Sequence, residues 1–332
     1  MTAKPHLSYQ EQIEVLAGRG LAFSDYELFL KVLRTVGYYR FSAYTYPLRV
    51  IAKGKDSSTV TRSEQFRPGA SFEDALALYE FDKKLRDLMS EGLEMVEIGL
   101  GAQIGHVLGR RDALAHLDKK FLDLSRCNAP DKPSKPHGLT SFEAWVEKFY
   151  FLRGRASAED YVVHHELKYG GRIPIWVCVE FLDFGALTRI YRLLNRWDRL
   201  EIAKRFGIVD DFAGLFEDWL DSLNVLRNQC AHHDRLWNRV HLNPRKPNLA
   251  SVSSSLLHIS DLRAIDLTRL YPLVAILGYL TRAQDGESAW LCNAQKLFSS
   301  FETSIGITPE NSMGFPDGWQ ELELWEPVRK SK

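Results

Sequence analysis

Residues 216–232 read FEDWLDSLNVLRNQCAH, and the apolar letters in this stretch recur with the spacing of an α-helix. At roughly 3.6 residues per turn, one face of that helix gathers the side chains of Phe216, Trp219, Leu220, Leu223, Leu226 and Cys230. An apolar stripe of this width is typical of a helix that packs against a helical core. We therefore predict a helix over residues 212–239 with this stripe buried.

A second, polar stripe lies beside the apolar one on the same predicted helix. Its members are Asn224, Asn228, His232, Arg235 and Arg239. Arg227 falls inside the apolar sector, where an unpaired buried charge would cost several kcal/mol. Arg227 is therefore expected to be paired or to face a polar site.

Three of these side chains suit the backbone of RNA. The guanidinium of Arg227 matches the geometry of a phosphate, and the imidazole of His232 can move protons near neutral pH. The amide of Asn228 can hydrogen-bond to either group or orient the imidazole. Helical periodicity alone leaves two interpretations open, a functional site and a buried structural network.

Helical spacing also dominates the rest of the chain. Further helices are predicted near residues 8–17, 24–36, 71–108, 141–153, 174–194 and 266–282. Residues 52–70 predict a surface loop or short hairpin, and the proline-rich residues 127–140 predict a loop insertion. The predicted class is all-α, a helical bundle with insertions. We expect an N-terminal segment over 1–70, a helical domain over 71–295 and an irregular tail over 296–332.

The bulk composition is that of an ordinary globular protein. Of 332 residues 45% are hydrophobic, and 43 Lys+Arg balance 43 Asp+Glu, so a surface that binds nucleic acid must be local. The four cysteines stand far apart, which favours isolated thiols over a zinc site. The first ten residues lack a signal-peptide core, and no apolar run is long enough to span a bilayer. We expect a cytoplasmic protein without a membrane partner.

Several blocks of the sequence resemble one protein family. The segment from Arg227 to His232 resembles the Arg-x4-His motif of HEPN-domain ribonucleases, and more specifically that motif in the AbiD/AbiF-like abortive infection family. Further blocks occur in the family's order at residues 38–42 (YYRFS), 78–86 (LYEFDKKLR) and 174–177 (PIWV). The resemblance spans roughly residues 5–290, and the four blocks together are far more specific than the short motif alone.

The resemblance implies a HEPN-type helical bundle with additional N-terminal helices, acting as an endoribonuclease without metal or cofactor. Such enzymes pair two Arg/His sets, and this chain carries one, which implies a homodimer with a composite site. His232 would act on RNA as a general base or acid, Arg227 would stabilise the charge on the phosphorane, and Asn228 would orient either group. His233 and Arg235 are possible supporting residues.

Candidate contacts to the RNA substrate lie outside the catalytic set. They are Arg40, Arg189, Arg192, Arg196 and Arg239. Arginines 189, 192, 196 and 199 would share one face if their helix continues that far, although a solvated helix face explains this spacing equally well. The family context also implies a regulatory partner, a small noncoding RNA that restrains cleavage until infection.

Two other functions are compatible with the sequence. His233 and Asp234 are adjacent, as in metal phosphohydrolases of the HD class, and residues 164–166 (HHE) could supply further ligands. The second alternative is a non-catalytic RNA-binding or regulatory module. Relatives of the resembled family often carry an arginine where this chain has Gly101, which favours the non-catalytic alternative, whereas the intact Arg/Asn/His set favours an enzyme.

Overall fold

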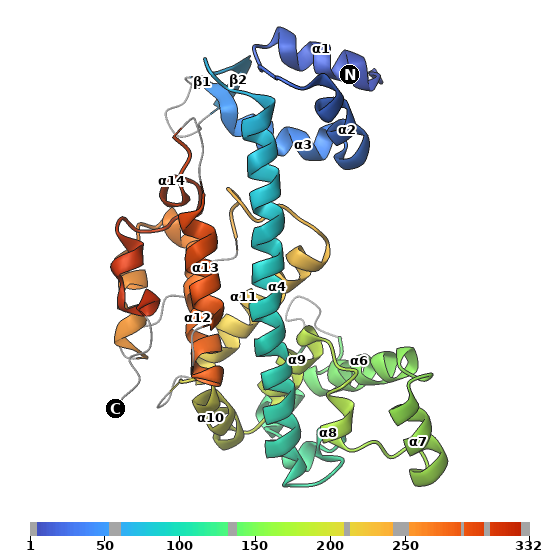
Figure 1. Ribbon diagram of the computed structural model, residues 1–332. Helices are drawn as coiled ribbons and strands as arrows, with labels where there is room; N and C mark the ends of the chain where they lie inside the picture. Colours follow the sequence, from blue (N-terminus) through green and yellow to red (C-terminus); the bar gives the residue numbers. More distant parts are fainter. Residues whose placement is uncertain are drawn as a thin grey trace. The chain divides into compact units, whose positions relative to one another are not determined.

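The chain folds into two compact, mainly helical units. The computed structural model describes residues 5–52, 61–131, 138–208, 213–241, 252–286, 289–301 and 306–326. Most of these residues are helical, and the strands among them form one two-stranded sheet, so the predicted all-α class is confirmed (Figure 1). Unit 1 comprises residues 1–85 and 297–312, and unit 2 comprises residues 86–296 and 313–332.

Unit 1 opens with short helices and a hairpin. The helices are α1 (Tyr9–Gly18), α2 (Tyr26–Val36), α3 (Tyr38–Thr45) and the one-turn 3-10 helix η1 (Tyr46–Leu48). Strands β1 (Arg49–Ala52) and β2 (Thr61–Phe66) then pair antiparallel, with Arg49 opposite Phe66. The prediction of a hairpin near 52–70 is confirmed by these strands, while residues 53–60 of that stretch lie outside the described residues.

The longest described helix, α4 (Phe72–Gly109), contributes residues 72–85 to unit 1 and residues 86–109 to unit 2. Ser71 caps its start, because the Asp74 N–H donates to Ser71 Oγ at 3.1 Å and the Ser71 N–H donates to the Asp74 carboxylate at 2.9 Å. At its first turn Phe72 stacks on Phe29 of α2, with ring centroids 4.1 Å apart, and both rings are fully buried. The predicted helix over residues 71–108 is confirmed.

Unit 2 contains most of the remaining helices. They are α5 (Leu124–Asn128), α6 (Ser141–Arg155), α7 (Asp160–Tyr169), α8 (Ile175–Cys178), α9 (Phe184–Leu193), α10 (Arg196–Arg205), α11 (Ala213–Ala231), α12 (Tyr271–Asp285) and α13 (Ala289–Ser299). The last residues of α13 belong to unit 1. Short 3-10 turns are η2 (Ala115–Leu117), η3 (Lys119–Phe121), η5 (Ser254–Asp261) and η6 (Asp266–Thr268).

Three predicted helices differ from the observed ones. The helix predicted over 174–194 is two helices, because the Asp183 carboxylate accepts from the Ala186 N–H at 2.8 Å and so starts α9 separately from α8. The helix predicted near 266–282 begins only at Tyr271, after η6. The helix predicted over 212–239 ends at Ala231.

The apolar stripe of α11 is buried, as predicted. Phe216, Trp219 and Leu226 have no exposed surface, and Cys230 is buried as well. α11 packs against α9, α10 and α12, and the Phe216 ring meets Tyr191 of α9 edge to face at 5.4 Å. One face of α11 therefore belongs to the core of unit 2, and the neighbouring face is available for polar side chains.

The described C-terminal residues, where an irregular tail was expected, include α14 (Pro309–Met313) and the 3-10 turns η7 (Trp319–Glu321) and η8 (Glu323–Trp325). Phe315 lies 4.5 Å from the Tyr271 ring of α12, and Trp319 lies 4.8 Å from Trp325. Phe315, Trp319 and Trp325 are buried in this aromatic cluster next to α12. Within the described ranges, every helix is too short or too polar to cross a lipid bilayer.

Candidate active site

The C-terminal end of α11 determines where the predicted catalytic residues lie. The His233 N–H donates to the Cys230 carbonyl at 3.0 Å, and the Asp234 N–H donates to the Gln229 carbonyl at 2.9 Å. These two bonds form a Schellman motif, which needs a residue in the left-handed conformation and most often uses glycine. His233 takes that conformation here, with a φ of 55°. The helix therefore ends at Ala231.

This helix end corrects the predicted polar stripe. Asn224 and Asn228 lie on α11 and line the same cleft. His232 is the first residue beyond the helix. Arg235 and Arg239 follow the turn, so the prediction that these residues continue the helical stripe is wrong. No glycine or proline marks the turn in the sequence, and helical periodicity could not locate it.

The segment after the turn is anchored in the core. Leu236 and Trp237 have no exposed surface, and His241 Nε2 lies 3.0 Å from the Leu236 carbonyl oxygen. Arg239 Nη1 lies 3.0 Å from the Asp234 carboxylate. The Arg239 guanidinium, expected to contact RNA, is therefore paired within the loop itself.

Arg227 is paired with an acidic side chain of α4. Its Nε lies 3.4 Å from Oε2 of Glu97, and 39% of the Arg227 side chain remains exposed against 20% of the Glu97 side chain. Burial raises the pKa of the Glu97 carboxyl, and the charge of Arg227 opposes that rise. The expectation that Arg227 is paired or faces a polar site is confirmed by this contact and by the cleft that the residue lines.

A polar cleft of about 730 Å³ opens where α5, α6, α9 and α11 adjoin. Helix α11 contributes Asp221, Asn224, Arg227 and Asn228, which are spaced as neighbours on one helical face. Helix α9 contributes Gly185, Thr188, Arg189 and Arg192 with the same spacing. The volume lies in the range of roughly 300–1,000 Å³ that ligand pockets occupy.

The arginine row predicted on one helix face does not form. Asn195 caps the start of a new helix, because its side chain accepts from the Asp198 N–H at 3.0 Å. Arginines 189 and 192 therefore lie on α9, whereas arginines 196 and 199 lie on α10. Arg196 is 5.5 Å from the ring of Trp197. Neither Arg196 nor Arg199 lines the cleft.

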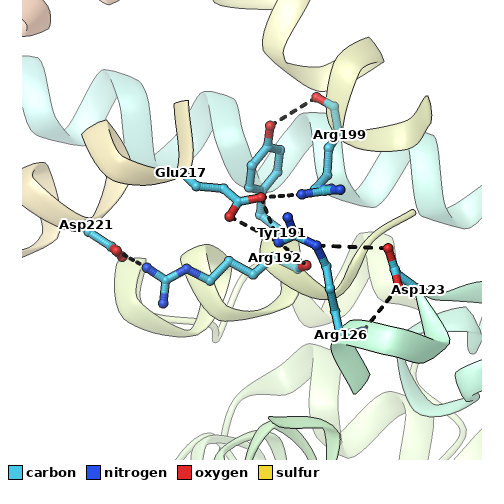
Figure 2. Close-up of polar contacts among 7 residues, drawn as sticks. All are labelled: Asp123, Arg126, Tyr191, Arg192, Arg199, Glu217 and Asp221. Atoms are coloured by element: carbon cyan, nitrogen blue, oxygen red, sulfur yellow. Dashed lines mark hydrogen bonds and ion pairs between the residues drawn. The ribbon is translucent and has the colours of Figure 1, made fainter. Parts of the chain in front are cut away.

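Figure 2 shows how acidic side chains hold the arginines near the cleft. Glu217 of α11 accepts from Arg199 and, at 2.9 Å, from Arg126 of α5. Arg192 pairs with Asp221 of α11. Two further ion pairs are not drawn in the figure. Arg189 pairs with Asp131, and Lys148 Nζ lies 2.7 Å from the Asp183 carboxylate. The cationic groups of the cleft are thus held in place by carboxylates.

A second hollow, of about 450 Å³, adjoins the first at Arg227 and Asp183, which line both. Glu97 lines this second hollow together with Glu159 and Glu180. The guanidinium of Arg227 therefore lies between a cleft rich in cations and a hollow rich in carboxylates, and Glu97 contacts it from the acidic side.

The remaining candidate residues lie outside the cleft. His232 and His233 are exposed at the end of α11, and Arg235 is half-exposed. The backbone N–H of His232 donates to the Asn228 carbonyl at 2.9 Å, so His232 is tied to the last turn of the helix that carries Arg227. Arg40 is exposed on α3 and belongs to unit 1. The structure thus brings Arg227 and Asn228 together in the cleft, with His232 exposed beyond them.

A protein-family model described as "Abi-like protein" matches residues 31–238. The chain belongs to the Abi-like protein family. The match includes the whole of α4, the cleft-forming helices and the Arg227–His232 segment, and it ends just after the buried Trp237. No curated protein and no solved structure matches the chain significantly.

Gly101 of this Abi-like chain lies in a buried, apolar part of α4. A Cβ atom at this position would lie 3.5 Å from Val179 Cβ and 3.6 Å from a Leu187 methyl group. Both distances are ordinary van der Waals contacts, so a small side chain fits, whereas an arginine would have to displace α8 or α9 side chains. The packing around Gly101 in this chain therefore leaves no space for an arginine side chain.

The sequence did not identify Glu97 as part of this site. Glu97 precedes Arg227 by 130 residues. The one signal for it in the sequence is that a carboxylate interrupts an apolar face of the helix predicted over residues 71–108. The residues considered as metal ligands include His164 and His165 on α7 and the His233–Asp234 pair. In the part of this Abi-like chain that the structure describes, no three His, Cys, Asp or Glu side chains are grouped as they would be to hold a metal ion.

Proposed function

We propose that this Abi-like protein is an antiphage abortive-infection ribonuclease of the HEPN type, which cleaves RNA without a metal ion. The proposal rests on one observation. A single helix carries Arg227 and Asn228 into a polar cleft and ends beside an exposed His232. Those groups are the cation, the amide and the proton carrier that cleavage of an RNA backbone needs.

In the proposed reaction the ribose O2′ attacks the adjacent phosphorus atom and the bond from phosphorus to O5′ breaks. A His232 imidazole accepts the proton of the 2′-hydroxyl, and a second His232, as imidazolium, donates a proton to the departing O5′. Arg227 stabilises the negative charge of the phosphorane, and Asn228 orients the phosphate or the imidazole. The products are a 2′,3′-cyclic phosphate and a 5′-hydroxyl.

The need for two imidazoles is met by a homodimer. Each chain carries one Arg227–His232 segment, and an isologous interface would bring two such segments to the same two-fold axis. The exposure of His232 at the end of α11 leaves it accessible to a second copy. RNA is the proposed substrate, and a small noncoding RNA is the proposed regulator that restrains cleavage before infection.

The test is expression of the wild type, the Arg227→Ala/His232→Ala double variant and a control, followed by mapping of RNA ends. His164→Ala is a matched control, because His164 is also an exposed histidine at a helical surface. We expect new 5′-hydroxyl ends in cells that express the wild type or the control and none with the double variant, and we expect the purified wild type to cleave RNA in the presence of EDTA. Cleavage by His232→Ala at the wild-type rate would refute the proposal, and loss of activity in EDTA would favour a metal phosphohydrolase.

A further inference from the structure

The cleft lies between a cationic wall on α9 and an α11 wall that carries one acidic and one cationic side chain. On α9, Arg189 and Arg192 line it, and on α11 the facing side chains include Asp221. In all, five cationic residues line the cleft against three acidic ones; the cations are Arg126, Lys148, Arg189, Arg192 and Arg227, and the acids are Asp131, Asp183 and Asp221. The lining therefore has an excess of two positive charges, because the carboxylates that pair with Arg126 and Arg227, those of Glu217 and Glu97, lie outside it.

Two of the internal pairs lie at the solvent-accessible part of the cleft. The side chains of Arg192 and Asp221 are each 43% exposed, whereas those of Arg189 and its partner Asp131 are 34% and 18% exposed. An ion pair as exposed as Arg192–Asp221 contributes little free energy, about 0–1 kcal/mol. An incoming anion can therefore take the place of the aspartate without a large cost to the fold.

We propose that this cleft binds the phosphodiester backbone of single-stranded RNA beside the scissile phosphate, with phosphates replacing Asp221 and Asp131 on Arg192 and Arg189. This inference deepens the proposed function and rests on it for the identity of the scissile phosphate. The aspartates act as internal competitors that hold the guanidinium groups in position and set the affinity for RNA.

The chemistry of the lining favours a phosphate chain over other ligands. Guanidinium groups bind phosphate through two parallel hydrogen bonds, and the amides of Asn224 and Asn228 add donors along the same cleft. Such contacts neutralise phosphates and make binding depend strongly on salt concentration. The two walls lead to Arg227, where the proposed chemistry takes place.

The test measures binding of a short fluorescent 2′-O-methyl oligoribonucleotide to the intact protein by anisotropy at several salt concentrations. This probe has no 2′-hydroxyl, so its binding is independent of cleavage. The variants are Arg192→Gln, Asp221→Asn and the control Arg196→Gln, whose position on α10 lies outside the cleft lining. Thermal unfolding confirms that each variant is folded, and Arg189→Gln with Asp131→Asn forms an independent second pair.

We expect Arg192→Gln to weaken binding about fivefold and to lower the slope of log K against log salt by about 0.7, the value for one phosphate contact on a single strand. Asp221→Asn should tighten binding about threefold, because it removes the competing carboxylate. Arg196→Gln should match the wild type.

Two results would overturn the inference. One is binding that Asp221→Asn leaves unchanged or weakens, which would make the Arg192–Asp221 pair purely structural. The other is displacement of the probe by polyglutamate as efficiently as by unlabelled RNA, which would indicate an acidic protein partner. If the expected binding changes occur but the wild type produces no 5′-hydroxyl ends, the proposed nuclease activity fails while the phosphate cleft stands.

Discussion

The Nε atom of Arg227 on α11 lies 3.4 Å from Oε2 of Glu97 on α4, across 130 residues of sequence. A contact through Nε occupies one edge of the guanidinium and leaves the donors of the terminal nitrogens for another anion. Glu97 is only 20% exposed, and burial raises the pKa of its carboxyl. Glu97 is therefore positioned to fix the orientation of Arg227.

Replacing Glu97 with alanine should lower RNA cleavage without unfolding the protein. A misplaced guanidinium costs about tenfold to a hundredfold in rate, and Glu97→Gln, which keeps an acceptor for Nε, should retain more activity than Glu97→Ala. The measurement is the cleavage rate at saturating RNA, compared with Glu159→Gln, a variant of an exposed carboxylate lining the same hollow. Equal rates for Glu97→Ala and Glu159→Gln would contradict the role of Glu97.

Replacing His233 with glycine should stabilise the protein. His233 has a φ of 55° at the end of α11, a conformation that costs a residue with a Cβ atom about 1 kcal/mol and costs glycine almost nothing. We expect the free energy of unfolding in urea to rise by about 0.5–1 kcal/mol. His232→Gly, one residue earlier at an ordinary φ, should give no such gain. A loss of stability in His233→Gly would show that the imidazole contributes more than its backbone strain costs.

Replacing Glu217 should destabilise the protein far more than replacing Asp221. Glu217 is 14% exposed and is the shared acceptor of Arg126 and of Arg199, whose side chain is 8% exposed (Figure 2). Glu217→Gln leaves a buried cation without its counter-charge, which costs about 3 kcal/mol. Asp221→Asn breaks a pair that is 43% exposed on both sides, so its cost should stay within about 1 kcal/mol. The measurement is the urea midpoint of unfolding for each variant. Similar midpoints would mean that Glu217 does not contribute more to stability than Asp221.

Stability should fall as the pH drops below 6.5. The His116 ring has no exposed surface, and burial lowers its pKa from 6.5 to about 4, while Asp112 opposes the change. Between pH 6.5 and about 4 the unfolded chain therefore binds more protons at this residue than the folded chain. The loss over that window is on the order of 3 kcal/mol.

The check is urea unfolding of wild type and His116→Phe across this pH window. Burial also lowers the pKa of His258 to about 4, so the variant should lose about half of the pH dependence and keep the rest. A variant with the same pH dependence as the wild type would show that His116 does not stay neutral in the folded state.

The burial of α11 could be predicted because Phe216, Trp219 and Leu226 repeat with an unbroken helical period. The end of the same helix could not be predicted, because His233 takes the left-handed conformation that a glycine usually takes at a helix end. The division between α9 and α10 could have been predicted from Asn195, because asparagine is a favourable residue at the start of a helix. The arginine spacing suggested a continuous helix instead.

The candidate site was predictable only where it is local in sequence. Arg227 and Asn228 are adjacent in sequence; the helical period placed Asn228 on the polar stripe, and the position of Arg227 in the apolar sector implied a partner or a polar site for its charge. The partners of the cleft cations come from distant segments, as with Arg126 and Glu217 or Arg227 and Glu97. Such pairings depend on tertiary packing, which periodicity within one helix does not report.

The end of α11 at Ala231 also bears on how the spacing of this motif can evolve. An extra residue inserted before Cys230 would rotate the following side chains by about 100° and break the buried stripe. An insertion after Ala231 would leave Arg227 in place, but it would shift the turn that bonds back to Gln229 and Cys230 and the fully buried Leu236 and Trp237 that follow it. The four residues between the cation and the imidazole are therefore held at both ends, by the buried stripe before the turn and by the buried Leu236 and Trp237 after it.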